Sequence, residues 1–216
     1  MIVNKEDLLE AARAFVKDEL GHDSSGHDYW HAHRVSELAG RIAAIESADV
    51  FVCRLTGLLH DIADEKLNES EEAGLQKVEY WLKHHMVDDK TINVVLEIIL
   101  TMPFKGGGMP PVRTLEGKIV QDADRLDAIG AIGIARAFAY SGKAGQLIHD
   151  PEIKPREHIE KENYRKGKNT AINHFYEKLL KLKDMMNTKT ARDLAEKRHR
   201  FMCEFLEHFY DEWEMK

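Results

Sequence analysis

Apolar residues recur every three to four positions through most of the chain, which is the spacing of one face of an amphipathic α-helix. Asn4 stands where an N-cap is expected, Gly21 follows the first helix, and Asp88 or Asp89 caps a later one. No stretch alternates apolar and polar residues as a half-buried strand would. The sequence therefore predicts an all-α fold with helices over residues 5–20, 27–46, 50–63, 70–85, 88–102, 169–186 and 188–216.

Two segments interrupt this helical pattern. Residues 103–113 contain three glycines and three prolines, and residues 141–168 mix turn-forming residues with many basic ones. Such stretches in a compact helical domain are often functional, and we expect one of them to border the functional site. Neither changes the composition as an interdomain linker would. We therefore predict one domain over residues 1–216, with its core at about 25–130 and C-terminal helices at about 169–214 packed on it.

The composition excludes several classes of protein. Of the 216 residues, 43% are hydrophobic and 32% charged, which is typical of a folded globular protein, and the net charge of −7 argues against a nucleic-acid binder. No apolar run reaches the ~20 residues of a membrane span, and no apolar signal core opens the chain. We expect a cytoplasmic protein in which Cys53 and Cys203 are buried free thiols. The three tryptophans stand at helical spacing, which predicts core packing.

The stretch "LTGLLHDIAD" sets a histidine beside an aspartate at the end of an apolar helix. On a helix Asp61 lies about 100° around from His60, and Asp64 lies one turn beyond His60, so all three occupy one side. Burying such groups without partners would cost several kcal/mol each. A metal ion would satisfy them, and the chain holds 12 histidines from which further ligands could come.

Two other stretches offer those ligands. In "HDYWHAHRV", His27 and His31 share a helix face, whereas His33 points elsewhere. In "VQDADRLDAIG", Asp124 shares a face with Asp127 and Asp122 points away from it. Mixed imidazole and carboxylate ligands suit manganese, iron, zinc or magnesium better than a closed thiolate site.

The ordered motifs "HAHRV", "GLLHDIAD" and "DADRLDA" resemble those of the HD superfamily of metal-dependent phosphohydrolases. The likeness runs from "HDYWHAHRV" through "QDADRLDAIGAIGIAR" to "NTAINHFYEKLLKLKDMMNT", and it is greatest to the small bacterial HD hydrolases implicated in nucleoside triphosphate pyrophosphohydrolysis. The resemblance implies a single HD-domain helical bundle with additional C-terminal helices. It makes His31, His60, Asp61 and Asp124 the metal ligands, since the last ligand of the family precedes a basic residue and leucine. Asp122 stays open as an alternative.

The resemblance also implies the chemistry: hydrolysis of a nucleoside or deoxynucleoside triphosphate to monophosphate and pyrophosphate, with Mn²⁺ as the expected metal and Mg²⁺, Fe²⁺, Ni²⁺, Co²⁺ or Zn²⁺ as alternatives. His84 and His85 could serve as ligands of a second metal, but they end a polar helix, where a charge interaction with the helix end explains them. A single metal is therefore expected. Asp64 is the candidate catalytic residue for proton transfer, or else a helix-end partner of Lys66. Candidates for binding the substrate are His27, Lys66, Arg125 and basic residues of 141–168, including Lys143, Lys154, Arg156, Arg165 and Lys168.

Three other interpretations remain open at this point. A 5′-nucleotidase or a phosphodiesterase would use the same ligands with a different pocket, and a nucleotide-sensing module would bind without turnover. The expected partner is a small phosphorylated molecule rather than a nucleic acid or a membrane, and a homodimer is compatible with the sequence.

Overall fold

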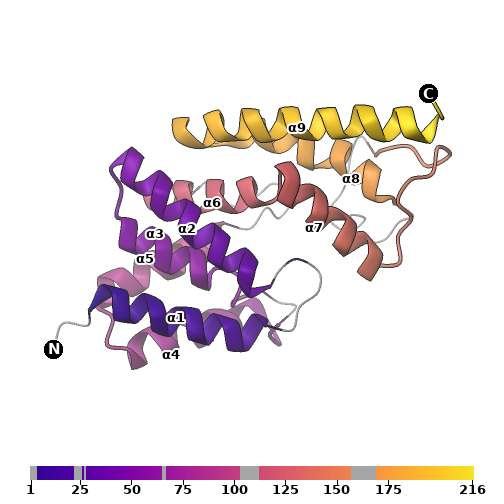
Figure 1. Cartoon of the computed structure of the whole chain (residues 1–216). Helices are drawn as coiled ribbons and strands as arrows, with labels where there is room; N and C mark the ends of the chain where they lie inside the picture. The colour runs from indigo at the N-terminus through magenta and orange to yellow at the C-terminus, as the bar shows by residue number, and fades with distance from the viewer. Residues whose placement is uncertain (1–3, 22–25, 27, 65–66, 103–111, 157–168) are drawn as a thin grey trace. The chain divides into compact units, whose positions relative to one another are not determined.

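The structure, a computed structural model, describes residues 4–21, 26, 28–64, 67–102, 112–156 and 169–216 (Figure 1). Within these ranges there is no strand, only an isolated bridge between Leu147 and Thr170. The all-α prediction is confirmed. The elements are α1 (Lys5–Leu20), α2 (Tyr29–Glu46), α3 (Val50–Leu59), α4 (Glu71–His84), α5 (Asp89–Thr101), α6 (Leu115–Asp127), α7 (Gly130–Lys143), α8 (Ala171–Glu177), the 3₁₀ helix η1 (Leu179–Met185) and α9 (Lys189–Trp213).

The chain divides into two compact units, residues 1–124 and 125–216. The first holds α1 to α5 and most of α6, and the second holds α7 to α9. A single domain over the whole chain stays a prediction. None of the helices within the described ranges combines the length and the apolar character that crossing a membrane requires.

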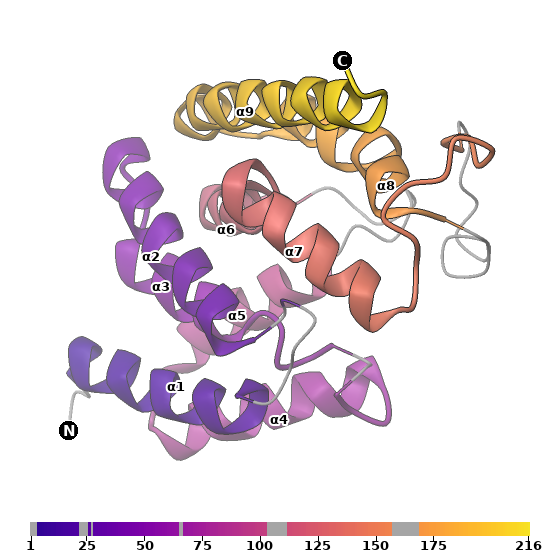
Figure 2. The ribbon, with the colours of Figure 1, turned by 45° about the vertical axis from the view of Figure 1, so that its right-hand side comes forward.

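In the first unit, α3 lies at the centre of the packing. It contacts α1, α2 and α5, and both views show it running beside α2 (Figures 1 and 2). Because neighbours surround it, α3 is apolar almost all round, and Leu55, Leu58 and Leu59 are fully buried. Cys53 is also fully buried; burial, aided by the carboxylates of Glu116 and Asp49, raises the pKa of its thiol to about 12.

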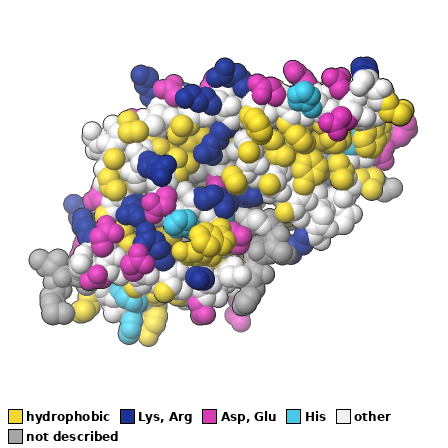
Figure 3. Space-filling model, in the orientation of Figure 1, with side chains coloured by type: hydrophobic (Ala, Val, Ile, Leu, Met, Phe, Trp, Pro, Cys, Tyr) yellow, Lys and Arg dark blue, Asp and Glu magenta, His cyan; other side chains and the backbone are white. Residues whose placement is uncertain are grey.

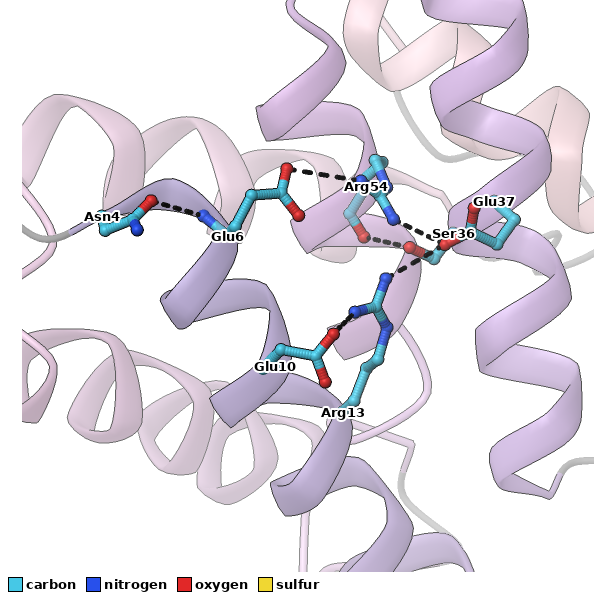
Figure 4. A network of polar contacts seen from close by, with 7 residues as sticks. All are labelled: Asn4, Glu6, Glu10, Arg13, Ser36, Glu37 and Arg54. Carbon is cyan, nitrogen blue, oxygen red and sulfur yellow. Dashed lines mark hydrogen bonds and ion pairs between the residues drawn. The ribbon is translucent and has the colours of Figure 1, made fainter.

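A network of charged side chains ties α1, α2 and α3 together at their surface (Figure 4). The Glu37 carboxylate on α2 accepts from Arg54 Nη2 on α3 at 2.6 Å and from Arg13 Nη2 on α1 at 3.2 Å. Ser36 Oγ donates to the carbonyl of Arg54 at 2.9 Å. Burial raises the pKa of Glu37, but the hydrogen bonds and charges of the two arginines outweigh it and lower the pKa. This network fixes the position of α2 along α3.

The second unit has an aromatic core and a buried ion pair between Arg156 and Glu177. Phe138, Phe175 and Phe205 are in mutual ring contact at 5.8–6.2 Å. The Glu177 side chain is fully buried and accepts three hydrogen bonds from Arg156, at 2.8–2.9 Å from its backbone N–H, Nε and Nη2. Exposed apolar side chains gather beneath α9 on the face shown in Figure 3. The exposed large apolar residues of this unit are Ile132, Tyr140, Leu147, Ile148, Tyr176, Phe201, Trp213 and Met215.

Several predicted boundaries were wrong. The second helix begins at Tyr29, not at residue 27, because the Asp28 side chain accepts the N–H of His31 and acts as its N-cap. The segment 169–186 is not one helix: Lys178 leaves the helical conformation (φ −137°), and the chain continues as η1. Cys203 is half-buried rather than buried, although both cysteines are free as expected. The predicted loop at 103–113 falls mostly outside the described residues.

Candidate metal centre

His31 lies in the first turn of α2, where the cap holds it in place. The Asp28 carboxylate accepts the backbone N–H of His31 at 2.9 Å, so the helix start and the histidine are fixed together. The His31 side chain is fully buried. It points into the first unit rather than into solvent, which is an uncommon place for an imidazole unless its nitrogens are engaged.

His60 and Asp61 follow directly after α3, and here the sequence prediction was wrong. The helix ends at Leu59 instead of continuing to residue 63, and residues 60–63 form tight turns. The His60 Nδ1 lies 2.9 Å from the carbonyl oxygen of Gly57, one turn back. If Nδ1 carries the proton and donates it to that carbonyl, the Nε2 lone pair faces the opposite way and is available to a metal.

Asp124 on α6 completes the arrangement. Its carboxylate oxygen lies 3.4 Å from His31 Nε2 and 3.9 Å from His60 Nε2. The Asp61 carboxylate lies 3.4 Å from His31 Nε2 and 3.2 Å from His60 Nε2. One donor atom each of His31, His60 and Asp124 all lie within 4.8 Å of one another. We call these four side chains the donor cluster.

The spacing and chemistry of the donor cluster fit a divalent metal ion. Donor atoms bind such an ion at about 2.0–2.2 Å, which places neighbouring donors about 3–4 Å apart around it. The four measured separations, 3.2–3.9 Å, fall in that range. The buried Nε2 of His60 accepts no hydrogen bond from any residue that the structure describes. A metal ion would provide its partner.

The electrostatics of Asp124 also suit a ligand. Burial raises the pKa of its carboxyl, but a hydrogen bond from His31 and the charges of His60 and His31 outweigh burial, and the pKa falls to about 2. The carboxylate is therefore ionised at neutral pH, as metal binding requires. Its side chain is 39% exposed, against 15% or less for the other three, so the cluster is most open at Asp124.

The two neighbouring aspartates lie elsewhere. Asp122 is fully buried, and within the described part of the chain it does not belong to the group of converging donors. The Asp127 carboxylate accepts from Arg136 Nη1 at 3.0 Å in the second unit. We propose Asp124 rather than Asp122 as the ligand, which is the choice that the family resemblance implies and that helix geometry alone left open.

The other predicted site residues are placed as follows. His27 and Lys66 lie outside the described residues, as do Arg165 and Lys168. Asp64 is half-buried directly after the turns of residues 60–63, with its carbonyl accepting from Asn68 Nδ2 at 2.9 Å. Arg125 donates from Nη1 to the carbonyl of Met185, and Arg156 holds Glu177, so both guanidinium groups are engaged within the protein.

The histidines at the end of α4 have local contacts. His85 caps the helix, and its Nδ1 lies 2.9 Å from the carbonyl oxygen of Trp81. His84 stacks on Tyr80 with ring centroids 6.2 Å apart. Neither belongs to the donor cluster among the described residues.

The expectation that all three tryptophans pack in the core was wrong. Trp81 is 9% exposed, but Trp30 is 59% and Trp213 46% exposed. Trp30 is the second residue of α2. At a helix end, helical spacing alone does not distinguish a buried position from one at the edge of the core.

An arrangement of two imidazoles and two carboxylates from three helical segments is typical of a metal-dependent hydrolase. The HD-domain family model matches residues 29–129, which contain all four side chains. The chain belongs to the HD superfamily of metal-dependent phosphohydrolases.

Solved structures agree over nearly the full length. An HD-superfamily hydrolase from Bacillus thuringiensis is 46% identical, with a TM-score of 0.79 over 99% of this chain and 100% of that one. A protein from Lactobacillus plantarum is 42% identical, with a TM-score of 0.84 over 100% of both chains. Bacillus subtilis YpgQ in complex with ADP is 37% identical, with a TM-score of 0.76 over 94% of this chain and 97% of that one.

Proposed function

We propose that this hydrolase converts a nucleoside or deoxynucleoside triphosphate to the monophosphate and pyrophosphate, with one Mn²⁺ bound by His31, His60, Asp61 and Asp124. The observation that carries the proposal is the convergence of the four side chains, whose nitrogen and oxygen atoms lie 3.2–3.9 Å apart. A nucleotide substrate is supported by the crystal structure of YpgQ, which contains ADP.

In the proposed reaction, water attacks the α-phosphorus and the bond to the oxygen bridging the α- and β-phosphorus breaks. The metal, when bound, polarises the phosphoryl group and lowers the pKa of a coordinated water. The contact between His60 Nδ1 and the Gly57 carbonyl holds the imidazole with Nε2 toward the cluster. A carboxylate oxygen of Asp64 accepts the proton of the attacking water, and pyrophosphate leaves with the bridging oxygen.

The negative charge of the triphosphate needs cationic partners, because the chain carries a net charge of −7. We propose His27 and Lys66 for this role, since both are close in sequence to donor-cluster residues. Arg125 adjoins Asp124 in sequence and donates from Nη1 to the Met185 carbonyl, and we propose that it contributes its positive charge. We also propose that residues 103–113 or 141–168 border the site, and a homodimer stays a prediction.

Product analysis tests the proposal. Purified protein loaded with manganese would be incubated with a panel of ribo- and deoxyribonucleoside triphosphates, and the products resolved by ion-exchange chromatography. The proposal expects monophosphate and pyrophosphate in equal amounts. Diphosphate and inorganic phosphate would place the attack at the γ-phosphorus instead, and would contradict it.

Three alternatives would give different results once nucleoside monophosphates and a phosphodiester are added to the panel. A 5′-nucleotidase releases nucleoside and phosphate from monophosphates, and a phosphodiesterase cleaves a diester. A nucleotide-sensing module would bind without turnover. The presence of Asp64 as a proton acceptor beside the four metal ligands favours hydrolysis over sensing.

A further inference from the structure

The indole of Trp30 is a large aromatic surface left in solvent one residue before His31 of the donor cluster. It is the most exposed of the three tryptophans, at 59%. It is the second residue of α2 and directly precedes His31, whose imidazole belongs to the cluster. Aromatic side chains stabilise a fold by burial, so an exposed indole at this position contributes little to the core.

Ring contacts hold this indole in place. Its centroid lies 5.1 Å from the Tyr29 ring at an interplanar angle of 64°, and 5.7 Å from the His33 ring at 89°. Tyr29 in turn packs against the buried core of the first unit. The indole is therefore positioned before any ligand arrives, which lowers the entropic cost of stacking on it.

Trp30 and His31 leave the same end of α2 in different directions. Consecutive Cα atoms are about 3.8 Å apart, and one helical step turns the side chain by about 100°. The indole thus leaves the same end of α2 as His31 but faces outward, while the imidazole faces the metal site. A nucleotide bound to the metal through its phosphates carries its base one ribose away from the metal, so the base needs an outward-facing partner.

We propose that Trp30 stacks on the nucleobase of the substrate. The inference rests on the nucleotide function proposed above. Every base has a π-face, so stacking on an indole favours a nucleotide over a bare polyphosphate without selecting one base strongly. Trp30 accordingly contributes affinity for nucleotides as a class.

Calorimetric titration of manganese-loaded protein with ADP and with inorganic pyrophosphate tests this, because the two ligands share a diphosphate and differ in the nucleoside. Trp30→Ala should weaken ADP binding about 5- to 140-fold, the equivalent of the ~1–3 kcal/mol of base–aromatic stacking, and leave pyrophosphate binding unchanged. Trp30→Phe should restore most of the loss. Tyr80→Ala is the matched control, because Tyr80 is an aromatic residue of the same unit that is 74% exposed.

Other results would overturn the inference. Unchanged ADP affinity in Trp30→Ala would show that the indole does not contact the base. An equal loss of ADP and pyrophosphate affinity would show that the substitution acts through His31 and the metal. Wild-type protein that binds pyrophosphate but no nucleotide would contradict the proposed function itself, and with it the inference.

Discussion

Replacing Gly57 by alanine would place a methyl group of α3 against the backbone of α2. The new Cβ would stand 2.8 Å from Ser36 Cα and 3.0 Å from Ser36 N, against 3.4 Å for ordinary contact. Both opposing atoms are backbone, so no side chain can rotate away and the helices must separate by about half an ångström. A gap of that size forfeits about a quarter of the dispersion attraction across the interface.

The expected loss of stability follows from two opposing terms. Overpacking costs typically about 1–3 kcal/mol, and the rigid neighbours here favour the upper half of that range. Alanine returns about 1 kcal/mol through its better helix propensity. We therefore expect Gly57→Ala to lower the free energy of unfolding by about 1–2 kcal/mol, measured by urea denaturation with circular dichroism.

The same substitution should also weaken metal binding. The Gly57 carbonyl oxygen lies 2.9 Å from His60 Nδ1, and α2 carries His31, so separating the helices moves the two imidazoles apart. Gly142→Ala on α7 is the control: its Cβ would meet nothing within 4 Å, and we expect stability to be unchanged or raised by up to about 1 kcal/mol. A Gly57→Ala protein as stable as wild type, with unchanged manganese affinity by calorimetry, would refute this reasoning.

Three further substitutions test the site and the second unit. Asp61→Ala should lose bound manganese on dialysis and hydrolytic activity together; stoichiometric metal by mass spectrometry with wild-type turnover would remove Asp61 from the ligand set. Asp64→Asn should keep its metal while kcat falls about 10²–10⁴-fold, because only proton transfer is lost; loss of metal would make Asp64 a ligand instead. Burial raises the pKa of Glu177, but the hydrogen bonds and charge of Arg156 and the hydrogen bond from Asn169 lower that pKa below the ordinary 4.5. The ionised carboxylate therefore stabilises the fold fully above pH 4.5, and this stabilisation is lost as the pH falls through the lowered pKa. Glu177→Gln should therefore cost about 1–3 kcal/mol at about pH 7 and less at about pH 3, and a difference independent of pH would show that the charge of Glu177 does not contribute.

Local sequence signals determined the helical fold. The N-cap Asn4 was predicted, and Asp88 was one of two candidates, because a side chain that caps a helix lies within three residues of the N–H it accepts. The apolar face of α1 was predicted because helical periodicity repeats along a single element. The motif around His60 and Asp61 identified the family, since both its residue types and their order along the chain are visible without a structure.

The folded chain decided where α3 ends and how its motif residues point. No local signal ends α3 at Leu59; a helix through residue 63 satisfied the pattern equally well. The contact of His60 Nδ1 with the Gly57 carbonyl, and the packing of the following turn, became visible only in three dimensions. The prediction that placed Asp61 and Asp64 on one helix face therefore failed, although both belong to the motif.

Spatial neighbours likewise separated Asp124 from Asp122 and Trp30 from Trp81. Asp124 lies 3.4 Å from His31, a residue 93 positions earlier, and no periodicity within α6 contains that distance. Trp30 and Trp81 both follow helical spacing, but α1 covers Trp81 through Phe15, at a ring distance of 5.4 Å, while Trp30 stays 59% exposed. A sequence determines which face of each helix is apolar, whereas the side chains that meet there depend on how the helices pack.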